Sequence, residues 1–429
     1  MRVTGNPGWQ RMSWYRWLSP ICLAAAMAAC TTTPVESAST AAQAASSDPS
    51  VADRPVARVQ QRQDWHFASD GVTFSNRLES ARLNGVERLA PGHYALAIAP
   101  EITPINPSPW YGFMVSAETE LPLVLEFHYR HGKARYRPKL SRDGQQWTEA
   151  GDAQYSEDGQ GGAILEVTAG PQPLHVFAQP PIGPADFMAW SGRLVDSGVV
   201  HRSVIGRSER RRPLHMLRLG NPDADEVLLV LGRQHPPEVT GTQAMMGFVD
   251  ELAGDSPLAR RFREQVLVIV VPLVNPDGVV EGNWRGNING QDLNRDWGPF
   301  TQAETRVVRD TLQRELGRAG RELVFTIDFH STWSDVFYTV EEDPARAPGG
   351  VLRRWIDGMQ QRYPGRIRES ARPAETAVFK NWVFNRYQVP AVTYEVGDRT
   401  GEAELGELAK FAADSLMRIL LGPRGSVEN

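Results

Sequence analysis

The stretch Glu226-Val-Leu-Leu-Val-Leu-Gly-Arg-Gln-His-Pro-Pro-Glu-Val-Thr-Gly241 decides how the second half of the chain folds. After Glu226 the run is apolar as far as Gly232, which predicts a buried strand. The segment that follows repeats apolar side chains at helical spacing, at Met245, Phe248, Val249 and Leu252. His235 and Glu238 therefore lie in a loop between a strand and a helix, where open α/β sheets build their sites.

A second apolar run, residues 323–328, is followed by His330. Because the carboxyl ends of neighbouring strands face one crevice, we expect His235, Glu238 and His330 to meet there. Two imidazoles and one carboxylate are the ligands of a catalytic zinc, which keeps a fourth position open for water. An HxxE pair alone is common by chance, and the other seven histidines show no ligand spacing. The metal prediction therefore depends on the residues downstream.

Polar residues suited to hydrolysis follow in the segments 275–297 and 392–398. Asn294 and Arg295 stand side by side and together can bind a carboxylate, since a guanidinium offers paired donors and the amide a further one. Arg285 can stabilise the oxyanion that forms when a carbonyl is attacked. Glu395 comes at the end of a short β-branched run, from which it can point into the same crevice as a proton shuttle.

The stretch from about residue 200 to 425 carries the motifs HxxE, NPDG, Arg, Asn-Arg, His and Glu in this order. In this it resembles the zinc carboxypeptidase family. The likeness is closest to the cytosolic-carboxypeptidase-like branch, through the His-Pro-x-Glu form and the segment from Gly282 to Trp297. The resemblance implies one Zn²⁺, held by His235, Glu238 and His330.

The resemblance also implies a substrate and roles for the remaining residues. Asn294 and Arg295 would bind the free C-terminal carboxylate of a peptide. Arg285 would polarise the scissile carbonyl. Glu395 would be the general base and acid, taking a proton from the attacking water and passing it to the leaving amine.

Five further positions shape this prediction. Asp328 and Asp296 are candidates to orient a ligand histidine or an arginine, the alternative being a plain structural role. The mobile tyrosine that the family commonly carries nine residues before Trp382 is replaced by Pro373, which puts substrate capping in doubt. Lys380 stands near the position at the base of the specificity pocket in related enzymes. A lysine there favours an acidic C-terminal side chain, whereas the alternative is an exposed surface lysine.

Residues 1–29 predict a lipoprotein signal peptide, with a positive start and a short apolar core that is too short to span a bilayer. The segment ends Met27-Ala-Ala-Cys30, which resembles a bacterial lipoprotein box. Lipidation of Cys30 would anchor the chain to a membrane of the cell envelope. The residue after Cys30 is Thr31 and not the aspartate that commonly retains lipoproteins at the inner membrane. We therefore expect the protein on the periplasmic face of the outer membrane. The alternative is an ordinary secretory signal.

The rest of the chain divides into three segments. Residues 30–58 are rich in small and polar residues and predict a flexible tether. Residues 59–197 carry short alternating runs separated by turn formers, which predicts an antiparallel β-sandwich, and they also resemble the sandwich that precedes the catalytic domain in the same branch. Residues 198–425 alternate strands with helices, which fits the family's α/β fold, a mixed twisted sheet flanked by helices.

Composition excludes several other functions. The only two cysteines fall in or next to the signal, which excludes thiol catalysis, a disulfide and cysteine-rich zinc sites. The net charge is −5, and no basic run interleaved with aromatics suggests nucleic-acid binding.

We expect a zinc metallocarboxypeptidase, with three alternatives. The same scaffold could trim peptidoglycan stem peptides, or it could deacylate small N-acyl amino acids. Asn294 and Arg295 count against deacylation, because that activity usually lacks the full pair. A non-catalytic peptide-binding lipoprotein would be expected to have lost the catalytic set, which is present here.

Overall fold

The structure is a computed structural model that describes residues 58–318 and 320–422. The predicted signal peptide, Cys30 and nearly all of the predicted tether lie outside the described residues. Within the described part, no helix combines the length and the apolar character needed to cross a membrane.

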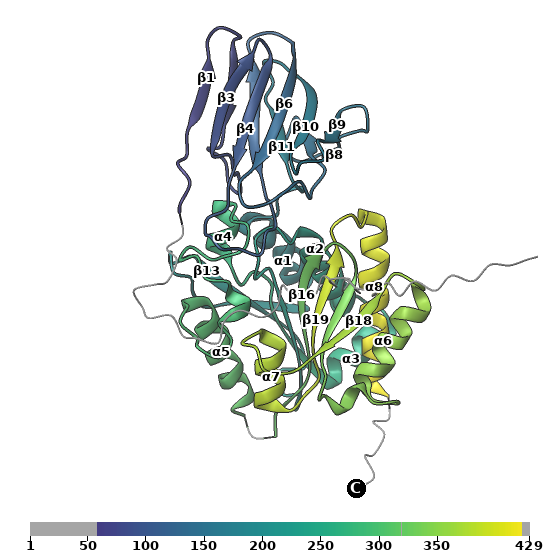
Figure 1. Cartoon of the computed structure of the whole chain (residues 1–429). Helices are drawn as coiled ribbons and strands as arrows, with labels where there is room; N and C mark the ends of the chain where they lie inside the picture. Colours follow the sequence, from purple (N-terminus) through teal and green to yellow (C-terminus); the bar gives the residue numbers. More distant parts are fainter. Residues whose placement is uncertain (1–57, 319, 423–429) are drawn as a thin grey trace, which may run out of the picture. The chain divides into compact units, whose positions relative to one another are not determined.

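The first part of the described chain is a β-sandwich of two sheets (Figure 1). The first sheet has the spatial order β1 (Asp64–Phe67), β2 (Val72–Ser75), β5 (Gly112–Ala117), β11 (Leu174–Phe177), β7 (Lys139–Ser141) and β8 (Thr148–Glu149). The second has the order β3 (Gly85–Ala90), β4 (His93–Ile98), β6 (Leu121–Tyr129), β10 (Ala163–Ala169) and β9 (Tyr155–Glu157). The predicted antiparallel sandwich is confirmed, except that β4 and β6 pair in parallel.

The alternation of buried and more exposed side chains along the strands explains how the two sheets pack. In β4 every second side chain is buried, which turns Tyr94, Leu96 and Ile98 toward the other sheet. The rings of Phe113 in β5 and Phe127 in β6 lie 6.2 Å apart, so aromatic side chains from both sheets fill the space between them.

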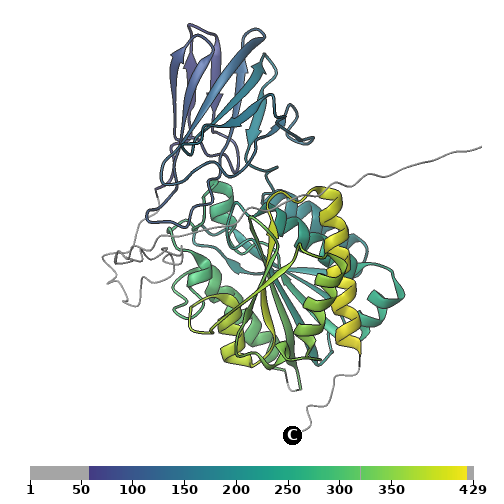
Figure 2. The same ribbon diagram turned by 45° about the vertical axis from the view of Figure 1, so that its right-hand side comes forward.

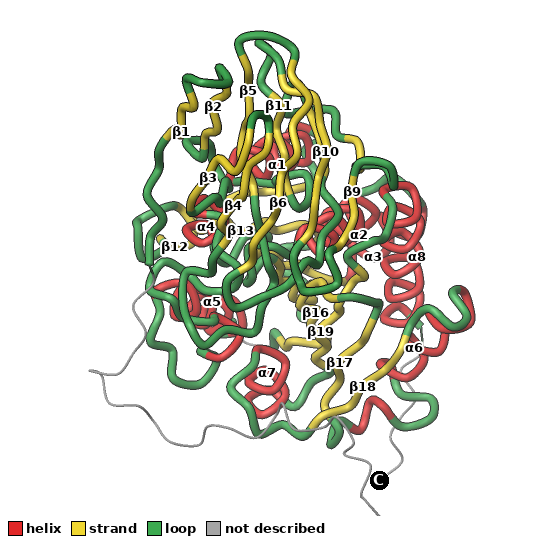
Figure 3. The backbone as a smooth tube through the Cα atoms, turned by 45° about the horizontal axis from the view of Figure 1, so that its top comes forward, coloured by secondary structure: helices red, strands yellow, loops and turns green. Residues whose placement is uncertain are grey.

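The second part of the chain is built on an eight-stranded mixed sheet, as the resemblance implied. Its spatial order is β12 (Val200–Arg207), β13 (Pro213–Gly220), β15 (Val266–Val271), β14 (Glu226–Gly232), β16 (Glu322–Thr332), β19 (Ala391–Gly397), β17 (Val336–Val340) and β18 (Arg368–Arg372). The four central strands, β15, β14, β16 and β19, run parallel. All six residues of β15 are buried, as expected for a parallel strand covered on both faces. Figure 3 shows β16, β19, β17 and β18 side by side in this order.

Helices cover both faces of this sheet (Figure 2). One face carries α1 (Pro184–Asp196), α2 (Val239–Ala253), α3 (Pro257–Gln265), α6 (Val351–Arg362) and α8 (Glu402–Leu421). The other carries α5 (Ala303–Leu316) and α7 (Phe379–Tyr387). The shorter elements are α4 (Pro276–Glu281), η2 (Leu293–Arg295) and η3 (Pro344–Arg346). The buried apolar stripe of α8 packs against α2 and α6.

Helix α1 belongs by its packing to the eight-stranded sheet, although it precedes residue 198. Phe187 and Trp190 of α1 are buried in the core that α2 and the sheet share. The indole nitrogen of Trp190 donates to a carboxylate oxygen of Asp250 in α2 at 2.8 Å. The core of the second part therefore begins before its first strand.

Candidate metal centre and substrate cleft

The three predicted metal ligands meet at the carboxyl ends of two central strands. His235 and Glu238 lie in the loop between β14 and α2, as the sequence indicated. His330 was expected after its strand, but β16 continues to Thr332, so His330 lies within the strand. There it pairs in register with Glu395 of the parallel neighbour β19. One register position thus brings a metal ligand and the expected general base together.

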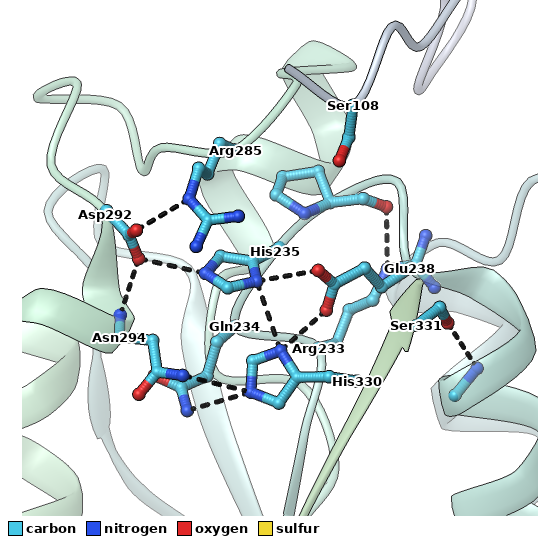
Figure 4. Close-up of polar contacts among 12 residues, drawn as sticks. Ser108, Arg233, Gln234, His235, Glu238, Arg285, Asp292, Asn294, His330 and Ser331 are labelled. Carbon is cyan, nitrogen blue, oxygen red and sulfur yellow. Dashed lines mark hydrogen bonds and ion pairs between the residues drawn. The ribbon is translucent and has the colours of Figure 1, made fainter. Parts of the chain in front are cut away.

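The ligating atoms of the three side chains face one another, as Figure 4 shows. Glu238 places Oε1 at 2.8 Å from His235 Nδ1 and Oε2 at 2.7 Å from His330 Nδ1. The two Nδ1 atoms lie 3.1 Å apart. Atoms bound at about 2.0–2.1 Å to a tetrahedral zinc are roughly 3.3 Å from one another, so these side chains fit one zinc ion with only small movements. All three are buried, at 3%, 4% and 1% exposure.

Two aspartates hold the far side of the imidazoles. His235 Nε2 lies 2.9 Å from Asp292 Oδ1, and His330 Nε2 lies 2.7 Å from Asp328 Oδ2. In the tautomer whose Nε2 hydrogen each carboxylate accepts, Nδ1 is the electron-pair donor toward a metal. Burial opposes ionisation of Asp292, but Arg285 and His235 outweigh it and hold the pKa of Asp292 well below its usual range. Asp328 is therefore positioned to orient His330, which is the candidate role that the sequence suggested. Asp292, which is positioned to orient His235, was assigned no role from the sequence.

Asp296 does not orient a ligand, so that candidate role was wrong. Its carboxylate accepts the backbone N–H groups of Thr301 and Gln302 and the hydroxyl of Thr305, at 2.8, 2.9 and 2.5 Å. These contacts fix the start of α5, which is a structural role. Asp292 takes the orienting position because it precedes the η2 turn and caps it, accepting the N–H of Asn294 at 2.9 Å.

Arg285 reaches the same site from the loop after α4. Its Nε donates to Asp292 Oδ2 at 2.6 Å, so one carboxylate links the arginine and His235 (Figure 4). The guanidinium is nearly buried and lines the cleft beside Glu238. Arg285 is thereby fixed next to the expected metal, where a carbonyl oxygen could accept from its remaining N–H groups.

Glu395 is partly buried and lies beside the ligands without being one of them. Burial and the nearby Glu238 carboxylate raise the pKa of Glu395 above that of an ordinary glutamate. Among the described residues, Oε2 of Glu395 has no hydrogen-bond partner. A buried carboxylate oxygen without a partner suits a position that faces a metal-bound water.

A cleft of about 330 Å³ opens over these residues. It is lined by Arg285, Asn294, Arg295, Tyr338, Arg372, Lys380 and Glu395 and by Arg135 of the sandwich, among others. Lys380 is 4% exposed, so it is not the surface lysine of the alternative reading. Burial lowers the pKa of Lys380 to about 8. Within the described chain, Arg295, Arg372 and Lys380 form no ion pair with an acid, which leaves three cations to meet a ligand.

The structure also shows the surroundings of Pro373, which stands where the family commonly has a mobile tyrosine. Pro373 follows β18, and its carbonyl lies 3.4 Å from Asn381 Nδ2 of α7. Tyr338 of β17 lines the cleft instead. Asn294 is fixed by its Oδ1, which accepts the N–H of Phe379 at 2.9 Å. Its Nδ2 lies 3.5 Å from His330 Nε2, and Asn294 lines the cleft together with Arg295.

A mixed sheet with a buried His-Glu-His set at its strand ends defines a metalloprotein with an open coordination position. Residues 193–414 match the model of one family, described as zinc carboxypeptidase. Because this match covers just over half of the 429 residues, the chain belongs to the zinc carboxypeptidase family. The resemblance noted in the sequence is thereby confirmed, and the family's single zinc corresponds to the His235, Glu238 and His330 set.

Curated relatives include the cytosolic carboxypeptidases 6 of mouse and human, each 31% identical over 139 residues. The aligned part is 30% of this chain and 26% and 28% of those proteins, so the chain matches about a quarter of their length. Among solved structures, the metallo-carboxypeptidase of Burkholderia cenocepacia has a TM-score of 0.69 at 19% identity, covering 81% of this chain and 98% of that one. The metallo-carboxypeptidase of Pseudomonas aeruginosa gives 0.66 at 22% identity, with coverage of 81% and 98%. At these identities the structures show a shared fold.

Proposed function

We propose that this chain is a zinc-dependent carboxypeptidase that releases the C-terminal residue of a peptide. The observation that carries the proposal is the single cleft that holds the metal set, Arg285 and Glu395 next to the Asn294–Arg295 pair. A pair of side chains that can bind a carboxylate, placed beside a hydrolytic metal, suits a substrate whose scissile bond lies one residue from a free C-terminus.

Each residue of the cleft has a task in this reaction. The Asn294 amide and the Arg295 guanidinium bind the terminal carboxylate and set the distance to the scissile bond. Arg285, held by Asp292, donates to the carbonyl oxygen as negative charge develops on it. Zinc, when bound, supplies a water whose pKa is lowered to about 7. Glu395 removes a proton from the attacking water and delivers it to the leaving amine.

The cleft also supports a preference for a C-terminal glutamate or aspartate. Lys380 and Arg372 both line it, and neither is neutralised by an ion pair with another described residue. Burial increases the attraction between Lys380 and a substrate carboxylate, since less water screens the two charges. Tyr338 adds a side chain that can donate from its hydroxyl to the same group.

A panel of peptides that differ only in the last residue tests both the carboxypeptidase activity and the preference for an acidic C-terminal residue. We expect zinc-dependent release of C-terminal Glu faster than of the isosteric Gln, and faster than of Leu or Lys. Lys380→Met should abolish the preference for Glu over Gln, while Lys380→Arg should keep part of it. Faster cleavage of Leu or Lys peptides refutes the acidic preference, and muropeptides with D-residues test the stem-peptide alternative.

The proposed location is a lipid anchor on the cell envelope through Cys30, on the periplasmic face of the outer membrane. This rests on the signal and lipoprotein box in the sequence. Labelling cells with a fatty-acid analogue tests it. The wild-type chain should incorporate label and fractionate with membranes, and Cys30→Ser should do neither. A labelled Cys30→Ser chain would contradict the anchor.

A further inference from the structure

The loop that carries Arg285 is held by the β-sandwich. Glu101 of the sandwich, 1% exposed, accepts three successive backbone N–H groups of this loop. Its Oε2 accepts from Trp284 at 2.7 Å, and its Oε1 accepts from Arg285 at 3.0 Å and from Gly286 at 2.7 Å. Successive N–H groups that converge in this way form a small anion-binding concavity of backbone. The Glu101 carboxylate of the sandwich therefore occupies an anion-binding concavity formed by the backbone of residues 284–286.

The residues just before Arg285 are inserted into the sandwich. Trp284 is fully buried among the core residues of the sandwich, and its indole nitrogen donates to the carbonyl of Trp110 at 2.9 Å. Arg82, also buried, donates to the carbonyl of Gly282 at 2.5 Å and to Asn283 Oδ1 at 2.8 Å. A Cβ on Gly282 would come within 2.6–2.7 Å of backbone oxygens of the sandwich, so the two backbones touch here.

We propose that the β-sandwich positions the oxyanion-stabilising arginine, with Glu101 as the positioning residue. This inference rests on the proposed carboxypeptidase function. The backbone of Arg285 is fixed by Glu101, and its guanidinium is fixed by Asp292, so the side chain is held at both ends. Loss of the Glu101 acceptor leaves three N–H groups without their partner in a buried place and releases the backbone end. Because Arg285 acts on charge that develops only in the transition state, the loss should fall on kcat and not on KM.

The test compares Glu101→Gln with Glu166→Gln, a control at an exposed position of strand β10 in the same sandwich. Glu101→Gln replaces one accepting oxygen by a donor that faces N–H groups. We expect it to lower kcat by about 10–100-fold, less than the roughly 10²–10³-fold that removal of an oxyanion donor costs because Arg285 itself remains, with KM changed less than about twofold. Glu101→Asp should recover part of the loss, and Glu166→Gln should behave as wild type. Zinc content should be unchanged in all three.

A double-mutant cycle separates positioning from general destabilisation. If Glu101 acts through Arg285, Glu101→Gln should have little further effect once Arg285 is alanine. Amide hydrogen exchange at residues 284–286 should rise in Glu101→Gln whether or not a substrate is present. A wild-type kcat in Glu101→Gln, or a full additional loss in the Arg285→Ala background, overturns the proposal. A wild-type chain that cleaves no peptide refutes the proposed function instead. In that case, unchanged amide exchange at 284–286 in Glu101→Gln would separately refute the proposal that Glu101 fixes this backbone.

Discussion

Replacing Asp292 by asparagine should weaken zinc binding more than its small change in shape suggests. The carboxylate accepts from His235 Nε2 at 2.9 Å through one oxygen and from Arg285 Nε at 2.6 Å through the other. An asparagine has a single oxygen, so its NH₂ group must face one of these two donors. Asp292→Asn therefore either destabilises the tautomer of His235 that binds the metal or releases the guanidinium of Arg285.

The expected magnitude follows from the role of such a partner. Loss of a carboxylate that orients a ligand histidine typically costs about 10–100-fold in metal affinity. At about 1.4 kcal/mol for each factor of ten, this is about 1.4–2.8 kcal/mol of zinc-binding free energy. Because Arg285 is released in the other orientation of the amide, kcat should fall as well, even when zinc is saturating.

Competition with a chromophoric chelator measures the zinc Kd at fixed pH. Asp296→Asn is the matched control, since this aspartate lies in the same six-residue motif but contacts only Thr301, Gln302 and Thr305. We expect Asp296→Asn to lower the melting temperature and leave the zinc Kd within about twofold of wild type, which is below the effect of an orienting partner. A wild-type Kd in Asp292→Asn, or equal weakening in both variants, would refute the reasoning.

Three other outcomes are expected. Glu395→Gln should lose on the order of 10²–10⁴-fold in kcat and still hold zinc, which steady-state kinetics and elemental analysis check together; unchanged turnover would remove Glu395 from its role. Since burial lowers the pKa of Lys380 to about 8, its charge is present below that pH and lost above it. The ratio of kcat/KM for Glu over Gln peptides should therefore fall as the pH rises through about 8, and a ratio that stays flat in the wild type would contradict this. Removing zinc should lower the unfolding temperature, by calorimetry, because the ligands converge only in the folded chain; an equal melting temperature with and without a chelator would argue against it.

The metal ligands could be predicted because short-range patterns fix them. A buried strand followed by a helix places His235 and Glu238 in one loop, and a second buried strand places His330 at the same edge of the sheet. Glu395 could be placed for the same reason, although its register beside His330 required the structure. The strand pairing, not the sequence spacing, brings these two residues together.

Asp328 was a candidate from the sequence, but the orienting role of Asp292 could not be predicted, because it depends on the direction of a turn. Asp292 and Asp296 flank the same turn, yet Asp292 faces His235 and Asp296 faces the start of α5. Glu101 stands 184 residues before Arg285, and nothing in either local sequence announces their contact. The cations Arg372 and Arg135 reach the cleft from an edge strand and from the sandwich, so only the tertiary fold reveals them.

A zinc titration that follows peptide cleavage tests the central claim most directly. Protein stripped of metal is given increasing zinc while the release of a C-terminal residue is measured. Release should begin from zero and saturate at one zinc per chain, and His330→Ala should neither bind zinc tightly nor cleave. Cleavage by the stripped protein, or full activity in His330→Ala, would show that His235, Glu238 and His330 do not form the hydrolytic centre.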